Sequence, residues 1–350
     1  MKVGKYSIEN FSSPYIIAEV GSNHNGDMDL AAQLIHAAKN AGCHCVKFQS
    51  WSKDTIFSKN VYENNYFLKD DYRNRSDFTL EEIVDKFSIS EQELLKMRNL
   101  CNELEIDFSS SPFSRREVDV LVKDLEAPFV KVASMDLNNY PFLDYIARQG
   151  KPVMLSTGLS TLSEIDRAVQ TIENAGNSEI ILLHCVSIYP PSDEMVHLNN
   201  IDMLRANYPD YPVGFSDHTI GTAIPLASVA KGACVIEKHF TLDKNMPGWD
   251  HKVSATEAEM REIVEGSGRI SKALGSYRRV LSDADHEKIP AFRRSLVAAR
   301  DISAGSIITK EDLDSKRPGT GIEPQYMNMV IGRVAKRDIP FDKVLSPEDF

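Results

Sequence analysis

The sequence predicts an α/β fold in which a closed (β/α)8 barrel (a TIM barrel) spans residues 1–275 and a small β-rich module spans residues 293–350. Two observations predict the barrel. From Tyr15 to about residue 275, eight β-branched or apolar runs alternate with helical patterns, as strands and helices do around a barrel. Several of these runs are apolar throughout, which is typical of strands covered on both faces. An open, doubly wound sheet is the alternative, but no glycine-rich nucleotide turn supports it.

The predicted strands and helices can be placed along the chain in order. The eight strand candidates are Tyr15–Val20, His44–Gln49, Ile106–Ser109, Phe129–Ala133, Val153–Ser156, Ile180–His184, Val213–Phe215 and Val235–Lys238. The spacing of leucines and alanines predicts a helix over Met28–Ala41. Capping-box patterns predict three more helix starts, at Ser90, Thr161 and Thr256.

One segment interrupts the alternation. Trp51–Phe87 is long, aromatic and charged, and it follows the second predicted strand on the face where barrel active sites lie. We interpret it as an insertion that covers or shapes the substrate pocket, with a plain surface excursion as the alternative.

The end of the chain differs from the barrel region. Ser276–Phe292 is polar and basic and contains Pro290, which predicts a linker. Beyond it, Arg300–Leu313 (RDISAGSIITKEDL) realigns with Arg337–Phe350 (RDIPFDKVLSPEDF), 37 residues later. This repeat predicts a small β-rich module with internal pseudo-symmetry.

Composition limits the possible functions. The 350-residue chain is 42% hydrophobic, so it can bury a large core. Its 40 basic and 51 acidic residues give a net charge of −11, which argues against nucleic-acid binding without excluding a small anionic substrate. The five cysteines show no zinc spacing and are expected to be reduced. With neither a signal-peptide pattern nor a bilayer-spanning apolar run, we expect a cytoplasmic protein without membrane contact.

Two histidines follow two neighbouring predicted strands. In a barrel, His218 and His239 would both project from the carboxyl ends of adjacent strands. The carboxylates Asp217, Glu237 and Asp250 lie near them in the sequence. Imidazoles beside carboxylates form a plausible site for a divalent metal. The alternative is that each histidine only makes a hydrogen bond within a loop.

Lysines and hydroxyls occupy other strand ends. A lysine inside a buried strand needs a partner, because an unpaired buried ammonium is costly. Lys47 and Lys131, together with strand-end serines, would suit a ligand that carries a phosphate and a carboxylate. Structural pairing of the lysines with Glu19 or Asp136 is one alternative. In another alternative, one of the lysines is a nucleophile that forms a Schiff base with the substrate. A metal that polarises an aldehyde would make such covalent catalysis unnecessary.

A series of motifs resembles one known family. IIAEVGSNHNGDMDLAAQLIHAAKNAGCHCVKFQ, FSSSPFS, FVKVAS, MLSTG, LLHCVSIYP, GFSDHTIG, EKHFTLDK and KRPGTG occur in this order. They closely resemble motifs of the sialic acid (N-acetylneuraminate, or nonulosonic acid) synthase family. The resemblance covers nearly the whole chain, and it includes the C-terminal module, which resembles a SAF (antifreeze-like) domain.

The resemblance implies an activity and a set of site residues. The reaction would condense phosphoenolpyruvate with the open-chain aldehyde of N-acetylmannosamine or a related sugar, and release phosphate. Glu19 matches the catalytic glutamate, which we assign to orienting or deprotonating water. His218 and His239 match ligands of Mn²⁺ or Mg²⁺. Residues that match phosphoenolpyruvate-binding positions are Lys47, Lys131, Ser156, Ser187 and Ser216, and Ser110 is a further candidate.

The resemblance also implies sugar contacts and an assembly. Gln49, Asp136, Tyr189 and Asp250 match sugar-contacting positions. Arg317, in the KRPG turn, matches an arginine that the SAF domain supplies from the other subunit of a domain-swapped homodimer.

Some positions depart from the family pattern and leave the acceptor open. Asp136 and Ser187 stand where some members carry Glu and Asn. A shorter side chain at a sugar contact changes discrimination by only about 1–3 kcal/mol. On the sequence, we favour N-acetylneuraminate synthase, with N,N'-diacetyllegionaminate synthase second. Rival functions are a Schiff-base pyruvate lyase and a non-catalytic sugar-binding protein.

Overall fold

A computed structural model describes residues 1–64 and 79–350 of the chain. These residues divide into two compact units, Met1–Gly275 and Ser276–Phe350, each of which is described by itself. The residues between 64 and 79 belong to the predicted insertion, and that part of the prediction lies outside the described residues.

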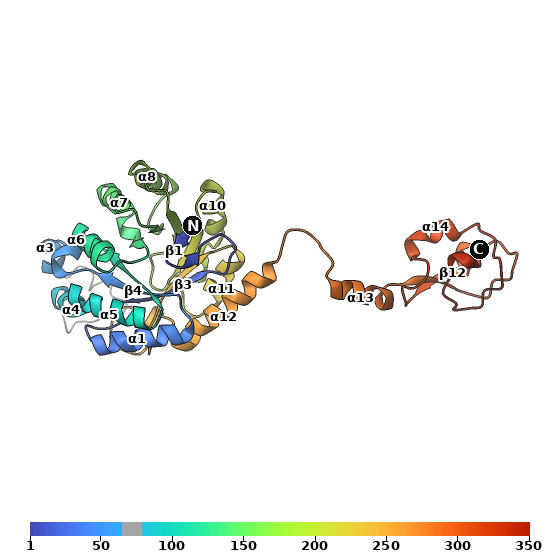
Figure 1. Ribbon diagram of the computed structural model, residues 1–350, viewed down its shortest axis with the longest axis horizontal. Coiled ribbons are helices and arrows are strands. Elements are labelled where there is room, and N and C mark those ends of the chain that lie inside the picture. Colours follow the sequence, from blue (N-terminus) through green and yellow to red (C-terminus); the bar gives the residue numbers. More distant parts are fainter. Residues whose placement is uncertain (65–78) are drawn as a thin grey trace. The chain divides into compact units, whose positions relative to one another are not determined.

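The first unit is built on eight parallel strands surrounded by helices (Figure 1). The strands pair in the order β5-β4-β3-β10-β9-β8-β7-β6. At the two ends of this order, Ser109 Oγ on β5 donates a hydrogen bond of 3.2 Å to the carbonyl of Phe129, next to β6. The predicted (β/α)8 barrel is therefore confirmed. The strands are β3 (Tyr15–Gly21), β4 (Cys45–Ser50), β5 (Asp107–Pro112), β6 (Val130–Val132), β7 (Val153–Ser156), β8 (Ile180–Cys185), β9 (Val213–Asp217) and β10 (Val235–His239).

The helices of this unit lie on the outside of the strands (Figure 1). Asp27 caps the first of them, and the three predicted capping boxes at Ser90, Thr161 and Thr256 begin α5, α8 and α12. The helices are α1 (Met28–Ala41), α2 (Lys53–Ile56), α3 (Lys59–Glu63), α4 (Leu80–Phe87), α5 (Glu91–Glu103), α6 (Arg115–Asp119), α7 (Tyr140–Ala147), α8 (Leu162–Asn174), α9 (Asp193–Val196), α10 (Asn199–Asn207), α11 (Ala223–Ala230) and α12 (Glu257–Leu274). Short single turns are η2 (Val120–Asp124), η3 (Ser134–Asp136) and η4 (His251–Val253).

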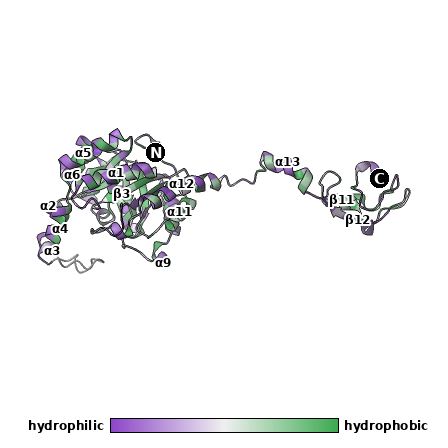
Figure 2. Cartoon of the chain, turned by 90° about the horizontal axis from the view of Figure 1, so that it is seen from below, coloured by the Kyte–Doolittle hydropathy of each residue, from purple (hydrophilic) through white to green (hydrophobic). Residues whose placement is uncertain are grey.

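Side chains of successive strand residues alternate between two cores. Ile16 and Ala18 of β3 belong to a large hydrophobic cluster shared with the helices. Tyr15 and Ile17 belong to a smaller cluster that the strands enclose near their amino ends. Figure 2 shows the result: the strands are largely hydrophobic, while the surrounding helices carry both hydrophobic and hydrophilic residues. The same alternation decides which strand-end residues face the barrel interior.

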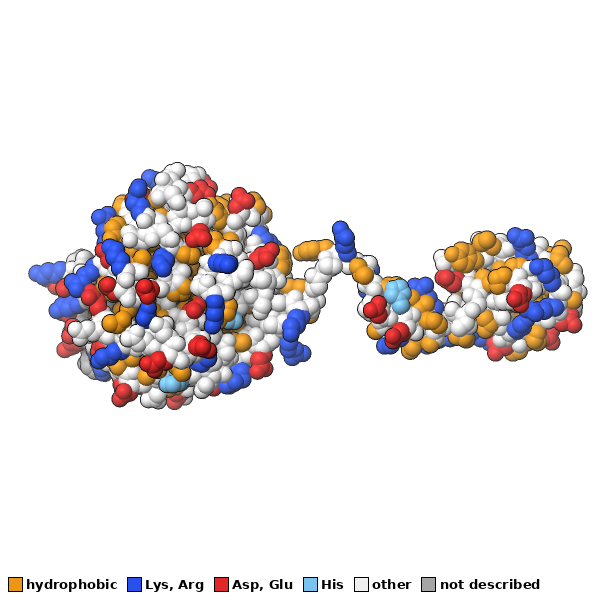
Figure 3. Space-filling model, viewed as in Figure 1, with side chains coloured by type: hydrophobic (Ala, Val, Ile, Leu, Met, Phe, Trp, Pro, Cys, Tyr) orange, Lys and Arg blue, Asp and Glu red, His pale blue; other side chains and the backbone are white. Residues whose placement is uncertain are grey.

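A short hairpin of β1 (Lys2–Val3) and β2 (Tyr6–Ser7) closes the amino end of the barrel. Val3 and Ile8 are buried against the inner cluster. The hairpin therefore covers the end of the barrel opposite the carboxyl ends of the strands. On the face that Figure 3 shows, acidic and basic side chains are interspersed, as the sequence's mixed charges lead one to expect.

The second unit confirms the predicted repeat. Asp301 Oδ1 accepts a hydrogen bond from the amide of Phe341 in the other copy. The equivalent Asp338 Oδ1 accepts one from the amide of Ala304, so each copy makes the same hydrogen bond to the other. Ile302 and Ile339 form a reciprocal bridge between the copies. The unit contains α13 (Asp283–Phe292), β11 (Ser295–Ala298), β12 (Leu313–Lys316), α14 (Met327–Val330), and the turns η5 (Lys310–Asp312), η6 (Pro324–Tyr326) and η7 (Pro347–Asp349).

The predicted linker holds more regular structure than expected. Ser282 caps α13, which extends through Pro290 to Phe292 and has no buried residue. No helix in the described ranges is long and apolar enough to cross a membrane.

Candidate active site

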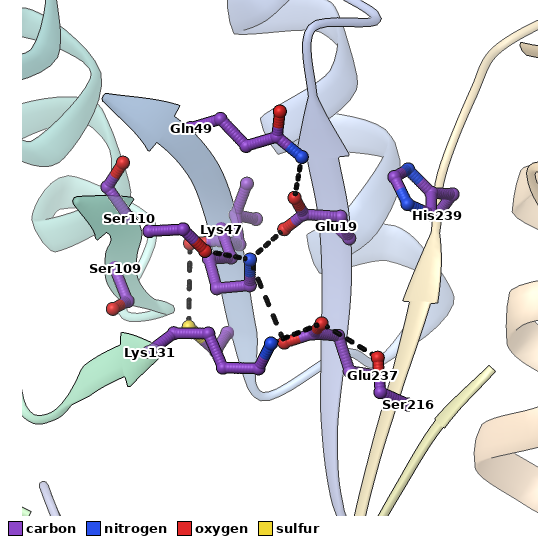
Figure 4. A network of polar contacts seen from close by, with 12 residues as sticks. Glu19, Lys47, Gln49, Ser109, Ser110, Lys131, Ser216, Glu237 and His239 are labelled. Carbon is purple, nitrogen blue, oxygen red and sulfur yellow. Dashed lines mark hydrogen bonds and ion pairs between the residues drawn. The ribbon is translucent and has the colours of Figure 1, made fainter. Parts of the chain in front are cut away.

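Polar side chains fill the barrel interior at the carboxyl ends of the strands. They continue the alternation that places apolar residues in the enclosed cluster below them. Figure 4 shows that they come from strands on several sides of the barrel and meet in one network. This is the end of the fold at which barrel enzymes carry their active sites. The residues joined by hydrogen bonds or ion pairs are Glu19, Lys47, Gln49, Ser111, Lys131, Ser216 and Glu237. Further polar residues at the same strand ends are Ser109, Ser156 and His239.

Lys47 lies at the centre of this network. Its Nζ is 2.6 Å from Glu19 Oε2 and 3.7 Å from Glu237 Oε2, and it donates a hydrogen bond of 2.8 Å to Ser111 Oγ. The side chains of Lys47 and Glu19 are only 2% and 3% exposed. The expectation that Lys47 needs a buried partner is confirmed, and Glu19 is that partner.

Glu237 joins the second lysine to the first. Its Oε1 lies 3.2 Å from Lys131 Nζ and accepts a hydrogen bond of 3.1 Å from Ser216 Oγ. Lys131 is therefore paired with Glu237 and not with Asp136, the partner considered from the sequence. Two buried ammonium groups thus face two buried carboxylates, an arrangement that offsets the large cost of removing these charges from water.

The two carboxylates differ in their affinity for a proton. Burial raises the pKa of Glu19 to about 7, against the opposing charge of Lys47. Burial alone would also raise the pKa of Glu237, but Lys131 and Lys47 lower it to about 2. Burial favours a neutral Lys47 amine, but Glu19 and Glu237 outweigh burial and raise the pKa of Lys47. Glu237 is therefore a permanent anion, while Glu19 can gain or lose a proton near neutral pH.

Gln49 holds the second oxygen of Glu19. Gln49 Nε2 donates to Glu19 Oε1 at 3.0 Å, and Trp51 Nε1 donates to Gln49 Oε1 at 3.1 Å. Because both amide atoms of Gln49 have partners, its orientation is fixed. Glu19 is consequently held from two sides, by Lys47 and by Gln49.

A group of hydroxyls lies beside the lysines. Ser156 Oγ is buried and has no hydrogen-bond partner among the described residues. A Cβ atom placed on Gly158 would come within 2.5 Å of Ser187 Oγ and 2.7 Å of Ser134 Oγ, so these two hydroxyls converge where Gly158 leaves room. Unpartnered and convergent hydroxyls are what a phosphate ester requires. Ser134 is not among the phosphoenolpyruvate-binding residues predicted from the sequence.

Ser110 occupies a different place from the one its predicted role needs. Its Oγ lies 2.5 Å from Ser50 Oγ, and alternation puts both residues on the outward side of their strands. The neighbouring Ser111 faces inward and accepts the bond from Lys47. In this structure Ser111, and not Ser110, joins the polar network.

The two predicted metal ligands come together. The ring centroids of His218 and His239 are 5.5 Å apart. His218 Nδ1 lies 2.7 Å from the carbonyl of Val186, which can only accept, so in the neutral ring Nδ1 carries the proton and Nε2 keeps its lone pair. The ring of Tyr189 lies 4.0 Å from that of His218. The contact between His218 Nδ1 and a backbone carbonyl is typical of histidines that bind metals.

Protonation differs between the two histidines. Burial lowers the pKa of His239 well below its usual value, and the charge of His218 lowers it further. Burial acts in the same direction on His218, but the Cys185 sulfur, 4.0 Å from Nδ1, and other neighbours raise its pKa overall. A metal binds the neutral form of an imidazole, so metal binding at this site would compete with protonation of His218 more than with protonation of His239.

Few other potential metal ligands among the described residues lie near the two histidines. His239 Nδ1 lies 3.8 Å from Asp250 Oδ2. Within residues 1–64 and 79–350, no three His, Cys, Asp or Glu side chains are arranged to enclose a metal ion. His218 and His239 would therefore be the two side-chain ligands of a metal here, and substrate or water would have to supply the others.

The remaining sugar-binding candidates are divided between the two units. Asp136, in η3, is half-buried and accepts a hydrogen bond of 3.2 Å from Asn139 Nδ2. Burial raises the pKa of its carboxyl group. In the second unit, the guanidinium of Arg317 lies 5.3 Å from the ring centroid of Phe292, at the end of α13. Phe292 is a contact that sequence reasoning did not identify.

The described parts of the insertion pack beside the site. Trp51 forms a small hydrophobic cluster with one face of α4, including Ile83 and Phe87. Trp249 packs against this cluster, with its ring 6.1 Å from that of Trp51 and 5.7 Å from that of Phe87. Because Asp250 follows Trp249 directly, the insertion supports the loop that carries a predicted sugar contact.

Comparisons with known proteins identify the family. A model described as the NeuB family matches residues 34–279, and a model of the SAF domain matches residues 293–350. An uncharacterized protein of Methanocaldococcus jannaschii is 40% identical over 349 residues, which are 100% of this chain and 98% of that protein. The N,N'-diacetyllegionaminic acid synthase of Legionella pneumophila is 37% identical over 322 residues, which are 91% of this chain and 89% of that protein.

A solved structure agrees with these sequence matches. The N-acetylneuraminic acid (sialic acid) synthetase of Leptospira borgpetersenii, in complex with citrate, superposes with a TM-score of 0.73 and 32% identity. The match covers 83% of this chain and 94% of that chain. The resemblance seen in the motifs is confirmed. The chain therefore belongs to the NeuB family of synthases and carries a SAF domain after its barrel.

Proposed function

We propose that this protein condenses phosphoenolpyruvate with the open-chain aldehyde of an N-acetylated amino-sugar to give a nine-carbon nonulosonic acid. C3 of phosphoenolpyruvate forms a bond to the aldehyde carbon, water adds to C2, and phosphate leaves as the C2–O bond breaks. The observation that carries the proposal is the buried group of Lys47, Lys131 and Glu19 within the same barrel mouth as His218 and His239.

The side chains divide the work between binding and proton transfer. Lys47 and Lys131 attract the anionic groups of phosphoenolpyruvate, and the hydroxyls of Ser156, Ser187 and Ser216 can donate to its oxygens. Glu19 orients the attacking water and accepts its proton, which its pKa of about 7 permits near neutral pH.

A divalent metal, Mn²⁺ or Mg²⁺, held by His218 and His239 would polarise the aldehyde oxygen. The closeness of the two rings, and the carbonyl contact that holds Nδ1 of His218 and leaves Nε2 to bind in the neutral ring, support this part of the proposal.

The electrostatics of Lys47 argue against a Schiff-base lyase. A nucleophilic lysine needs a lowered pKa to supply a free amine, whereas Glu19 and Glu237 raise the pKa of Lys47. We therefore expect no borohydride trapping of Lys47 with pyruvate.

For the acceptor, we propose 2,4-diacetamido-2,4,6-trideoxymannose, with N-acetylmannosamine second. The sequence alone favoured the reverse order. The Legionella relative, named as an N,N'-diacetyllegionaminic acid synthase, supports the new order because its 37% identity extends over 91% of this chain. Asp136, shorter than the Glu of some members, is consistent with a changed sugar contact.

The test is phosphate release from phosphoenolpyruvate with Mn²⁺ and each sugar in turn. We expect release only when an amino-sugar is present, with a higher kcat/KM for the diacetamido sugar. His218→Ala and His239→Ala should abolish metal-dependent turnover. Preference for N-acetylmannosamine would make the protein an N-acetylneuraminate synthase. No release with either sugar would favour the non-catalytic sugar-binding alternative.

We also propose that the protein is a homodimer in which Arg317 reaches the sugar site of the partner copy. Large apolar side chains are exposed in the loops after four successive strands, β6 to β9, which supports an apolar rim that a second copy covers. Their exposed fractions are 61% for Met135, 76% for Leu159, 45% for Ile188 and 57% for Ile220.

A further inference from the structure

A buried ion pair lies immediately before the two histidines in the sequence. Lys238 Nζ is 2.5 Å from Asp217 Oδ2, and the two side chains are 1% and 0% exposed. Asp217 precedes His218, and Lys238 precedes His239. The two residues stand directly opposite each other in the ladder between β9 and β10. The pair therefore joins the two points at which the imidazoles leave the sheet.

This ion pair faces away from the substrate. Ser216 and Glu237 point into the barrel, where they bond to each other, so the next residues on each strand point outward. Phe215 and Ile236, also on the outward side, belong to the core between strands and helices. Asp217, which the sequence placed among possible site carboxylates, therefore has no access to a substrate or metal.

The pair also holds the turn that carries His218. Asp217 Oδ1 accepts a hydrogen bond of 2.9 Å from the amide of Thr219, and Lys238 Nζ donates one of 2.6 Å to the carbonyl of Thr219. The backbone immediately after His218 is thus fixed by side chains that lie behind it. With its ring bonded to Val186, His218 has little freedom to change its position relative to His239.

We infer that Asp217 and Lys238 are positioning residues that set the separation of His218 and His239 for metal binding. This inference rests on the metal site of the proposed function. A buried ion pair is a poor source of stability, because apolar residues of the same volume serve as well or better. A geometric role accounts for two charges in a layer that is packed mainly with apolar side chains. Groups that orient metal ligands in this way commonly affect metal affinity.

The experiment measures Mn²⁺ binding to the full-length protein without substrates, by the electron paramagnetic resonance signal of free Mn²⁺. The double variant Asp217→Asn/Lys238→Met removes both charges at nearly constant volume, so no unpaired charge is left buried. We expect its Kd for Mn²⁺ to rise roughly 10- to 100-fold. The KM for phosphoenolpyruvate should change much less, because Lys47 and Lys131 are untouched.

Ile236→Val is the matched control. It shortens a buried, outward-facing side chain on the same strand and leaves the ion pair intact. We expect it to lower the melting temperature without changing the Kd for Mn²⁺. A second check adds the double change to His218→Ala, where it should weaken Mn²⁺ binding no further because one of the two positioned ligands is already lost.

The outcomes separate the inference from the proposed function. If the wild-type protein and the double variant bind Mn²⁺ with the same Kd, the positioning role is overturned and the proposed function still stands. An equal loss in Ile236→Val would attribute the effect to general destabilisation and also overturn it. Wild-type protein that binds no Mn²⁺ but still releases phosphate would overturn both the metal site and this inference.

Discussion

Glu19 is a carboxyl group whose charge is finely balanced by its surroundings. Burial raises its pKa to about 7, so it is largely protonated in mild acid and ionised above neutrality. Only the ionised form can accept a proton from water. We expect kcat/KM to rise as the pH increases through about 7, and Glu19→Gln to lower kcat by roughly 10²- to 10⁴-fold. Steady-state rates from pH 5.5 to 9 measure both effects.

A variant of Gln49 tests the assignment of this pH dependence. Gln49→Leu removes the hydrogen bond to Glu19 Oε1, a bond that favours the ionised carboxylate. The rise in rate should therefore move to higher pH in this variant. If the residual activity of Glu19→Gln keeps the wild-type pH profile, another group titrates and Glu19 is not the base.

At the same scale, the sequence predicted which residue types lie at the strand ends better than it predicted which side of the strand each one faces. Three consecutive serines, Ser109 to Ser111, give no sign of which ones face inward, because identical side chains hide the alternation. The structure resolves this, since Ser110 bonds to Ser50 while Ser111 bonds to Lys47. The partner of Lys131 was equally hidden, because only the closed barrel brings Glu237 to it.

At the scale of elements, local signals succeeded where the interactions are local. A capping box involves two residues within a stretch of four, so the boxes at Thr161 and Thr256 could be recognised directly in the sequence. The eight strands could be predicted because apolar runs reflect burial on both faces. Helix α13 was missed because its stretch is polar and contains Pro290. The contact of Arg317 with Phe292 was also missed, because 25 residues separate them in the sequence.

The repeated elements of the SAF domain allow a paired test of stability. Asp312 accepts from Arg300 and from the Thr309 amide, and Asp349 accepts from Arg337 and the Ser346 amide. Asp349 has an additional partner, because Lys343 Nζ lies 2.5 Å from its Oδ1. We expect Asp349→Asn to destabilise the domain by about 1–3 kcal/mol and Asp312→Asn by less. Hydrogen exchange at the amides of Ile302 and Ile339 in the full chain measures this difference.

The same carboxylate predicts a pH dependence. Burial alone would raise the pKa of Asp349, but Lys343, the Ser346 amide and Arg337 lower it to about 2. A carboxyl group with a lowered pKa stabilises the fold above its unfolded pKa, about 3.9, and loses this effect as the pH falls toward 2. The difference in stability between wild type and Asp349→Asn should shrink from pH 5 to pH 3. A constant difference would mean that the charge of Asp349 contributes nothing.

At the scale of the whole molecule, the proposed exchange of SAF domains makes a quantitative prediction. Glu19→Gln inactivates the barrel, and Arg317→Ala is expected to weaken the sugar site from the SAF side. In an exchanged heterodimer of these two variants, one site combines both defects and the other combines two intact parts. Random mixing of subunits makes about half the dimers hybrid, so the mixture should recover about a quarter of wild-type activity.

The hybrid dimer distinguishes an exchanged arrangement from an unexchanged one, because each variant alone is defective. The two proteins are co-expressed with different tags, the hybrid is purified through both tags, and its phosphate release is compared with that of each parent. If Arg317 acted on the barrel of its own chain, every site of the hybrid would carry one defect and no activity would return. A hybrid that recovers activity with the sugar KM of wild type would establish that the two copies share each site. The exposed apolar rim around Leu159 would then be a surface that the partner covers.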